Sequence, residues 1–133
     1  MTNKTIKITG VVDVVGGLAT DSLSGQIYFV DNNKAGGSKN LGTEQLETAV
    51  EKGDRLVWTV CFLECEAYAC IEDIIIDPDY CEPELKVYQG TDVSYWTGIV
   101  KRSVKSVPYN IRLLLGTREE PISTASPLKL IGT

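Results

Sequence analysis

The chain has 133 residues, the size of one ordinary domain that can bury a core without a metal or a disulfide to hold it together. Its contents of 43% hydrophobic and 23% charged residues are typical of a globular protein, and its apolar runs are too short to cross a bilayer. The net charge of −5 argues against binding to a nucleic-acid backbone, which requires clustered Lys and Arg. We therefore expect a single domain over residues 1–133 with no nucleic-acid or membrane partner.

The amino-terminal part predicts two strands and a long loop. The first strand covers Thr5–Val15. A β-bulge at Gly10 could shift the alternation, so that the apolar residues before and after it lie on the same face of the strand. Gln26–Val30 forms the second strand. A polar segment rich in Asn, Gly, Ser and Lys follows, and such a composition is typical of an exposed loop.

Arg55–Phe62 is the strongest strand, with apolar or small residues on both faces, which suits a central strand that is covered on both sides. Trp58 and Cys61 should therefore be buried. The preceding segment, Thr43–Lys52, is compatible with a helix or a strand. We favour a strand that pairs with Arg55–Phe62 as a hairpin across Gly53-Asp54, because the central strand needs a neighbour.

The remaining elements are strands separated by turns. They cover Ile71–Asp77, Leu85–Gln89, Val93–Lys101, Pro108–Gly116 and Leu128–Ile131, and the second and third form a hairpin. The pattern predicts an all-β fold, namely an antiparallel β-sandwich of about eight strands.

The four cysteines do not have the spacing of paired zinc knuckles, so we expect no metal site. Cys65, Cys70 and Cys81 lie in or beside one connection, where we expect reactive thiols, and the alternative of a disulfide among them stays open. The acidic stretch with Asp77, Asp79, Glu82 and Glu84 lacks the calcium-loop pattern and is expected to form a solvated turn.

Catalysis is not expected, because the sequence contains no histidine and therefore lacks the commonest general base and triad partner. No Gly-x-Ser-x-Gly elbow is present either. We accordingly predict no enzyme, no catalytic residue and no cofactor. The alternative of a histidine-free enzyme would have to rely on carboxylates such as Asp77 or Glu82. The first ten residues show no apolar segment of a secretory signal, which favours a cytoplasmic protein.

A ligand site is the alternative function. Asp31, Asn32 and Asn33 open the long loop, and Tyr95 and Trp96 lie on a predicted strand, where alternation places them on opposite faces. One of these two rings should be exposed. An exposed ring beside Asn and Asp side chains can hold a sugar or another small ligand, which makes these five residues the candidate ligand-binding set.

Several short motifs resemble the AidA/PixA inclusion-body family of bacterial proteins. They are Val11–Asp13, the Gly53-Asp54 turn that leads into the strand of Trp58, the late strand of Tyr109, and Pro127 before the last strand. The closing segment, SPLKL, departs from the family pattern because no aspartate precedes its proline. The resemblance implies a cytosolic, self-associating and non-catalytic sandwich, sometimes discussed as a sugar binder, and it assigns no site residues.

Self-association is the function that we expect first, with copies of the same chain as the partner. Strands at the edge of a sheet pair readily unless charge, proline or a bulge blocks them. The first strand carries a run of valines and little charge, so we expect it to be the edge through which two copies pair. Lys in place of Val12 or Val14, whichever faces outward, should then give a monomer.

Overall fold

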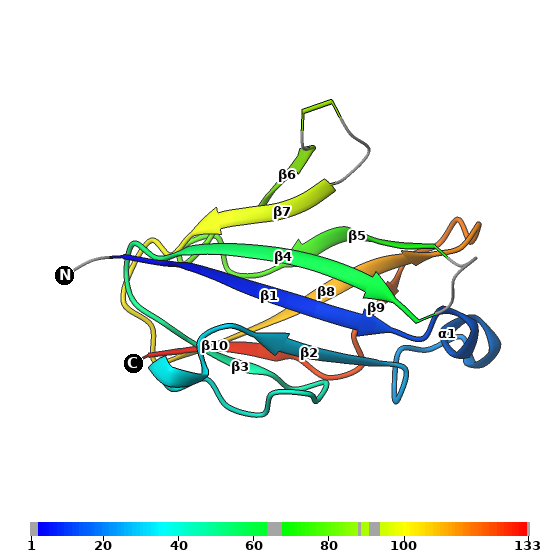
Figure 1. Cartoon of the computed structure of the whole chain (residues 1–133), viewed down its shortest axis with the longest axis horizontal. Coiled ribbons are helices and arrows are strands. Elements are labelled where there is room, and N and C mark those ends of the chain that lie inside the picture. The colour runs from blue at the N-terminus through cyan, green and yellow to red at the C-terminus, as the bar shows by residue number, and fades with distance from the viewer. Residues whose placement is uncertain (1–2, 64–67, 88, 91–93, 133) are drawn as a thin grey trace.

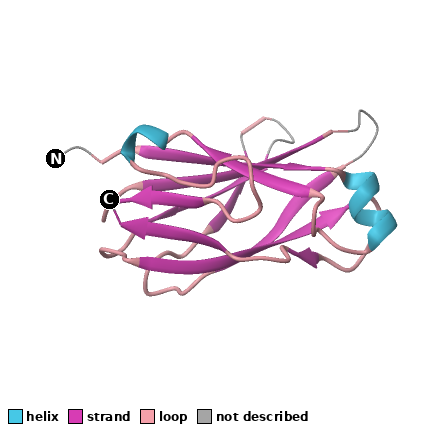
Figure 2. Ribbon diagram, turned by 90° about the horizontal axis from the view of Figure 1, so that it is seen from below, coloured by secondary structure: helices cyan, strands magenta, loops and turns pink. Residues whose placement is uncertain are grey.

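Strand β4 (Arg55–Phe62) lies in the middle of the first of two sheets, as the sequence predicts. The order of this sheet is β2 (Ile27–Asp31), β1 (Thr5–Val12), β4, β7 (Ser94–Ile99) and β6 (Glu84–Val87). The second sheet contains β3 (Glu47–Val50), β10 (Leu128–Gly132), β8 (Ser106–Leu115) and β5 (Ala69–Ile75), and the short β9 (Ile122–Ser123) pairs with β8. The computed structural model describes residues 3–63, 68–87, 89–90 and 94–132, and its two sheets pack face to face (Figures 1 and 2).

The predicted all-β sandwich is confirmed. The described residues form ten strands, where the sequence pattern predicts about eight, and β9 is an element that the pattern missed. The hairpin of β6 and β7 is confirmed, with Val87 opposite Ser94. Each sheet also contains one parallel pair, β1 with β4 and β3 with β10. Both parallel pairs join strands that are distant in the sequence, so reasoning from neighbouring segments does not foresee them.

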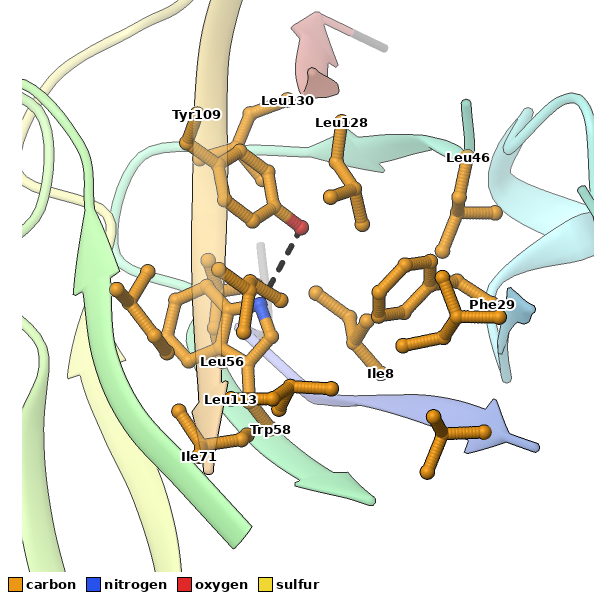
Figure 3. Close-up of a cluster of buried hydrophobic side chains, with 14 of the residues drawn as sticks. Ile8, Phe29, Leu46, Leu56, Trp58, Ile71, Tyr109, Leu113, Leu128 and Leu130 are labelled. Carbon is orange, nitrogen blue, oxygen red and sulfur yellow. Dashed lines mark hydrogen bonds between the residues drawn. The ribbon is translucent and has the colours of Figure 1, made fainter. Parts of the chain in front are cut away.

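The core lies between the two sheets. Leu56 and Trp58 on β4 and Tyr109 on β8 are almost fully buried, and the last two side chains meet across the gap (Figure 3). The indole Nε1 of Trp58 donates a hydrogen bond to the phenol oxygen of Tyr109 at 3.2 Å, and the rings meet edge to face with centroids 5.9 Å apart. Burial raises the pKa of Tyr109 well above its ordinary range, although the Trp58 hydrogen bond opposes this shift. The prediction that Trp58 is buried is therefore confirmed.

A short helix follows β1, where the sequence predicted that the strand continues to Val15. Helix α1 (Val14–Thr20) lies at one end of the sandwich (Figure 2). Its amino-terminal cap is Asp13, whose carboxylate accepts a hydrogen bond from the amide of Gly16 at 2.9 Å. A Cβ on Gly17 would lie only 2.7 Å from Leu115 Cδ1, so the helix packs closely on the end of β8. Cap and packing thus outweigh the weak helix propensity of Val and Gly. No helix among the described residues is long and apolar enough to cross a membrane.

The chain crosses from one sheet to the other between β3 and β4. The segment Thr43–Lys52 contains a strand, as we favoured, but the predicted hairpin across Gly53-Asp54 is wrong because β3 pairs with β10. Asp54 is fully buried at this crossing. Its carboxylate accepts hydrogen bonds from the amides of Glu51 at 2.9 Å and Lys4 at 3.2 Å. The carboxylate therefore ties the crossing to the start of β1.

Strand β1 is an inner strand, so the prediction that it is the edge for self-association is wrong. It pairs with β2 on one side and with β4 on the other, and both ladders run without a bulge at Gly10. The ring of Phe29 lies where a Cβ on Gly10 would be, with its Cε1 atom 2.7 Å from that position. Val12 and Val14 are both buried, so neither offers an outward position for the proposed Lys substitution.

The cysteines also differ from expectation. Cys61 is exposed, because the second sheet covers only the face of β4 that carries Leu56 and Trp58. Cys81 is fully buried and Cys70 is partly buried, and both have free thiols. The prediction that Cys61 is buried is therefore wrong, and Cys81, which we expected to be accessible, is the buried thiol. Cys65 lies outside the described residues.

Candidate functional site

The first half of the predicted ligand set forms structural contacts around the end of β2. Asn32 accepts a hydrogen bond from the amide of Lys7 at 3.0 Å, and Asp31 Oδ1 accepts one from the amide of Asn33 at 2.8 Å. Asp31 Oδ2 is buried without a partner among the described residues, and its charge contributes to the raised pKa of Tyr109. Asn33 is buried and donates to the carbonyl of Ala49 at 2.7 Å.

The expected exposed loop after β2 instead closes one side of the sandwich. Its 3-10 helix η1 (Lys34–Gly36) leads to a segment that hydrogen-bonds to both edge strands on this side. Gly42 donates to the carbonyl of Phe29 on β2 at 2.8 Å, while Lys39 exchanges two hydrogen bonds with Glu47 on β3. The edges of β2 and β3 are therefore occupied by the chain itself.

The second half of the predicted set lies on β7. Both Tyr95 and Trp96 are partly buried, so neither is the exposed ring that we expected. Trp96 faces the second sheet, and its indole Nε1 donates to the carbonyl of Ile71 on β5 at 3.1 Å. Strands β1 and β4 separate β7 from β2, which places the two halves of the set about 14 Å apart at ordinary strand spacing. The fold does not bring these five residues into one site.

An aromatic pocket opens beside Trp96, and we call it the wedge. The ladder of β7 with β4 ends at the Trp58–Trp96 pair, and β7 then diverges from β4 toward its own amino-terminal end (Figure 1). The wedge has a volume of about 300 Å³ and is lined by residues of β4, β7 and the start of β5. Its aromatic residues are Trp58, Phe62, Tyr68, Tyr95 and Trp96. Of these aromatic residues, the sequence analysis had named Tyr95 and Trp96 as ligand contacts. It missed the other three, since the wedge depends on three strands that are distant in the sequence.

The exposed rings of Phe62 and Tyr68 lie at the mouth of the wedge, beside the thiol of Cys70. Phe62 and Tyr68 are 37% and 57% exposed, and their ring centroids are 6.3 Å apart. The pKa of the Tyr68 phenol is raised above its ordinary value, chiefly because its side chain hydrogen-bonds to Cys70. Tyr68 is therefore a neutral phenol near neutral pH.

Strand β6 forms the open edge of the first sheet. It pairs with β7 on one side, and no backbone hydrogen bond reaches its other side within the part of the chain that the structure describes. Leu85 and Val87 are 52% and 62% exposed, because β6 extends beyond the second sheet (Figure 1). The Nζ atom of Lys86 lies 3.4 Å from Oε1 of Glu84, and both side chains are also exposed.

Other parts of the described surface are weaker candidates for a binding site. A hollow of about 350 Å³ lies beside Asn3, Lys52 and Ser103, all of which are exposed, and no ring lines it among the described residues. Within the described ranges, no cluster of three or more His, Cys, Asp or Glu side chains could hold a metal. In the acidic turn, Asp77 accepts a hydrogen bond from the amide of Asp79.

The fold is that of an inclusion-body protein sandwich. The chain is similar to the crystal structure of the inclusion body protein PixA from Burkholderia cenocepacia J2315, with a TM-score of 0.75 and 12% sequence identity. That match covers 100% of this chain and 98% of the other, and it confirms the resemblance seen in the sequence motifs. Residues 4–120 match the family described as a domain of unknown function, DUF8788, and the chain belongs to that family. No curated protein matches the chain.

Proposed function

We propose that this protein is non-catalytic and associates with copies of itself through strand β6. The observation that carries the proposal is the contrast between the two sides of the sandwich. One side is closed by the segment that bonds to β2 and β3, whereas β6 keeps a free backbone edge with exposed Leu85 and Val87 beside it. Such an edge is a template for pairing with another strand.

The residues of β6 suit a second copy of the same strand. In an antiparallel pair centred on Leu85, each Glu84 lies opposite Lys86 of the other copy and Leu85 lies opposite its counterpart. Opposite charges across a strand pair are stabilising, and the arrangement has the two-fold symmetry of an isologous dimer. The two five-stranded sheets then form one continuous sheet of ten strands.

Two further observations support the proposal. The chain contains no histidine, which fits a role without general acid-base catalysis. The printed name of the structural neighbour, an inclusion body protein, fits a protein that self-assembles. A sugar site that needs Asp31–Asn33 together with Tyr95 and Trp96 finds less support, because these residues lie on strands that are not adjacent.

Charge reversal tests the proposed contact. Glu84→Lys alone, or Lys86→Glu alone, turns two attractive cross-strand pairs of the dimer into repulsive ones. Because each of the two lost pairs is worth about 0.2–1 kcal/mol, either variant should weaken association by about 2- to 30-fold, and the repulsion between the new like charges adds to this. The double variant, E84K/K86E, exchanges the charges and should restore the affinity of the wild type.

Sedimentation velocity over a hundredfold range of protein concentration measures this affinity. Glu119→Lys, at an exposed position in the connection after β8, is the matched control for the change in net charge and should leave β6 pairing intact. A wild-type protein that stays monomeric throughout would overturn the proposal. So would a double variant that associates no better than the single variants.

A further inference from the structure

We propose that the wedge between β4, β5 and β7 binds a small, uncharged aromatic molecule. This inference goes beyond self-association and does not depend on it, because the wedge opens between the sheets and not along the edge of β6. Its volume of about 300 Å³ is at the lower end of the range for ligand pockets, which suits a molecule of one or two rings.

The walls of the wedge are held in place by the fold. Trp58 forms the floor and is fixed by its hydrogen bond to Tyr109 on the second sheet. Trp96 forms a side wall and is fixed by its hydrogen bond to the carbonyl of Ile71. Both rings therefore keep their orientation without a ligand, and a binding site that is already formed avoids the cost of ordering its side chains.

The lining favours an uncharged aromatic molecule. None of the described residues that line the wedge is charged, so a bound ion would lose its hydration without gaining a counter-charge. The two tryptophans with Phe62 and Tyr68 offer ring faces and edges for stacking or edge-to-face contact. A ligand that contacts Phe62 and Tyr68 from inside the wedge would also cover two rings that are now exposed to water.

Polar groups at the wedge can orient one hydrogen-bonding substituent. Ser94 shares the inner face of β7 with Trp96, and the phenol of Tyr68 lies at the mouth. Beyond Trp58, β4 has no partner on the β7 side within the described residues, so backbone groups also face the wedge. A phenol-like ligand, with one hydroxyl on an aromatic ring, matches this combination.

Tryptophan fluorescence provides a direct test, because the chain has two tryptophans and both line the wedge. The probe is 2-naphthol, which is uncharged at neutral pH and absorbs where tryptophan emits. We expect saturable quenching with one site per chain. 2-Naphthalenesulfonate has the same rings with a fixed charge and should show no saturable quenching.

Two variants locate the site. Ser94→Phe should fill the wedge and weaken 2-naphthol binding by at least about tenfold, which corresponds to about 1.4 kcal/mol. Ser24→Phe adds the same ring at an exposed position in the connection after α1 and should leave binding unchanged. Tyr68→Ala, at a position outside the strands, should also weaken 2-naphthol binding. This variant tests the location of the site if the Ser94→Phe substitution prevents folding.

Several outcomes would overturn the inference. They are the absence of saturable quenching by 2-naphthol, equal binding of the sulfonate, and unchanged binding in the folded Ser94→Phe variant. Displacement of 2-naphthol by methyl glucoside would instead assign the wedge to sugars and exclude the preference for aromatic ligands.

Discussion

At the scale of single residues, the two thiols on and near the first sheet show how burial controls chemistry. Burial raises the pKa of Cys81 to about 11 from an ordinary value of 9.0, with the charge of Glu82 adding to the shift and that of Lys101 opposing it. Cys61 points to solvent from the uncovered face of β4. Cys81 should therefore stay protonated in the folded protein under conditions in which an exposed thiol ionises.

This difference predicts a loss of stability at alkaline pH. Between pH 9 and about 11, the Cys81 thiol ionises in the unfolded chain but remains protonated in the folded protein. The unfolded state then binds fewer protons, so the free energy of unfolding falls as the pH rises through this window. Urea unfolding at several pH values should show a smaller fall for Cys81→Ala than for the wild type.

Cys61→Ala is the matched control, because it removes an exposed thiol from the same sheet. Its unfolding free energy should follow the wild-type dependence on pH. A Cys81→Ala variant that loses as much stability as the wild type between pH 9 and 11 would contradict the assignment of this effect to Cys81.

At the scale of elements, the crossing between β3 and β4 depends on one carboxylate. Asp54 accepts hydrogen bonds from the amides of Lys4 and Glu51 and from the side chain of Asn3. The same turn continues into the first sheet, since the carbonyl of Asp54 accepts from the amide of Val100 at 2.9 Å. Asp54 thus fixes the position at which the chain leaves one sheet and enters the other.

Asp54→Ala should lower the free energy of unfolding by about 3 kcal/mol, since each donor left buried without a partner costs about 1–3 kcal/mol. Urea unfolding followed by tryptophan fluorescence measures the change. Asp79→Ala removes an exposed carboxylate and should change the stability by no more than about 0.5 kcal/mol. An equal loss of unfolding free energy in the two variants would show that the buried carboxylate of Asp54 does not stabilise the crossing.

At the scale of the whole molecule, stability should decrease from the centre of the sandwich toward β6. Strands β1, β4 and β8 each have ladder partners on both sides, whereas β6 has one neighbour and four exposed residues. Regions with few buried contacts open most readily, and their amides exchange fastest.

Hydrogen exchange at low protein concentration should therefore be slowest in β1, β4 and β8 and fast in β6. If β6 is the contact between copies, its amides should become protected as the protein concentration rises. The Glu84→Lys variant should show fast exchange in β6 at every concentration. Slow exchange of β6 in the wild-type monomer would contradict the open edge.

The sequence by itself determined the features that depend on local periodicity. Strand β8 alternates Tyr109, Ile111 and Leu113 toward the core, and the β6–β7 hairpin joins segments that are adjacent in the chain. Alternation has a period of two residues, so a short segment shows both that it is a strand and which residues share a face. The all-β class and the buried Trp58 follow from the same local information.

Only the tertiary structure decided which strands become neighbours and which faces are covered. The second sheet covers one face of β4, which exposes Cys61, and the packing of α1 on β8 turns Val14 and Val15 into a helix. The same holds for both candidate sites. The wedge exists because β7 diverges from β4 beside β5, and β6 is open because no other segment bonds to its outer side within the described residues. Each of these features depends on contacts between residues far apart in the chain, and a local sequence pattern carries no information about such contacts.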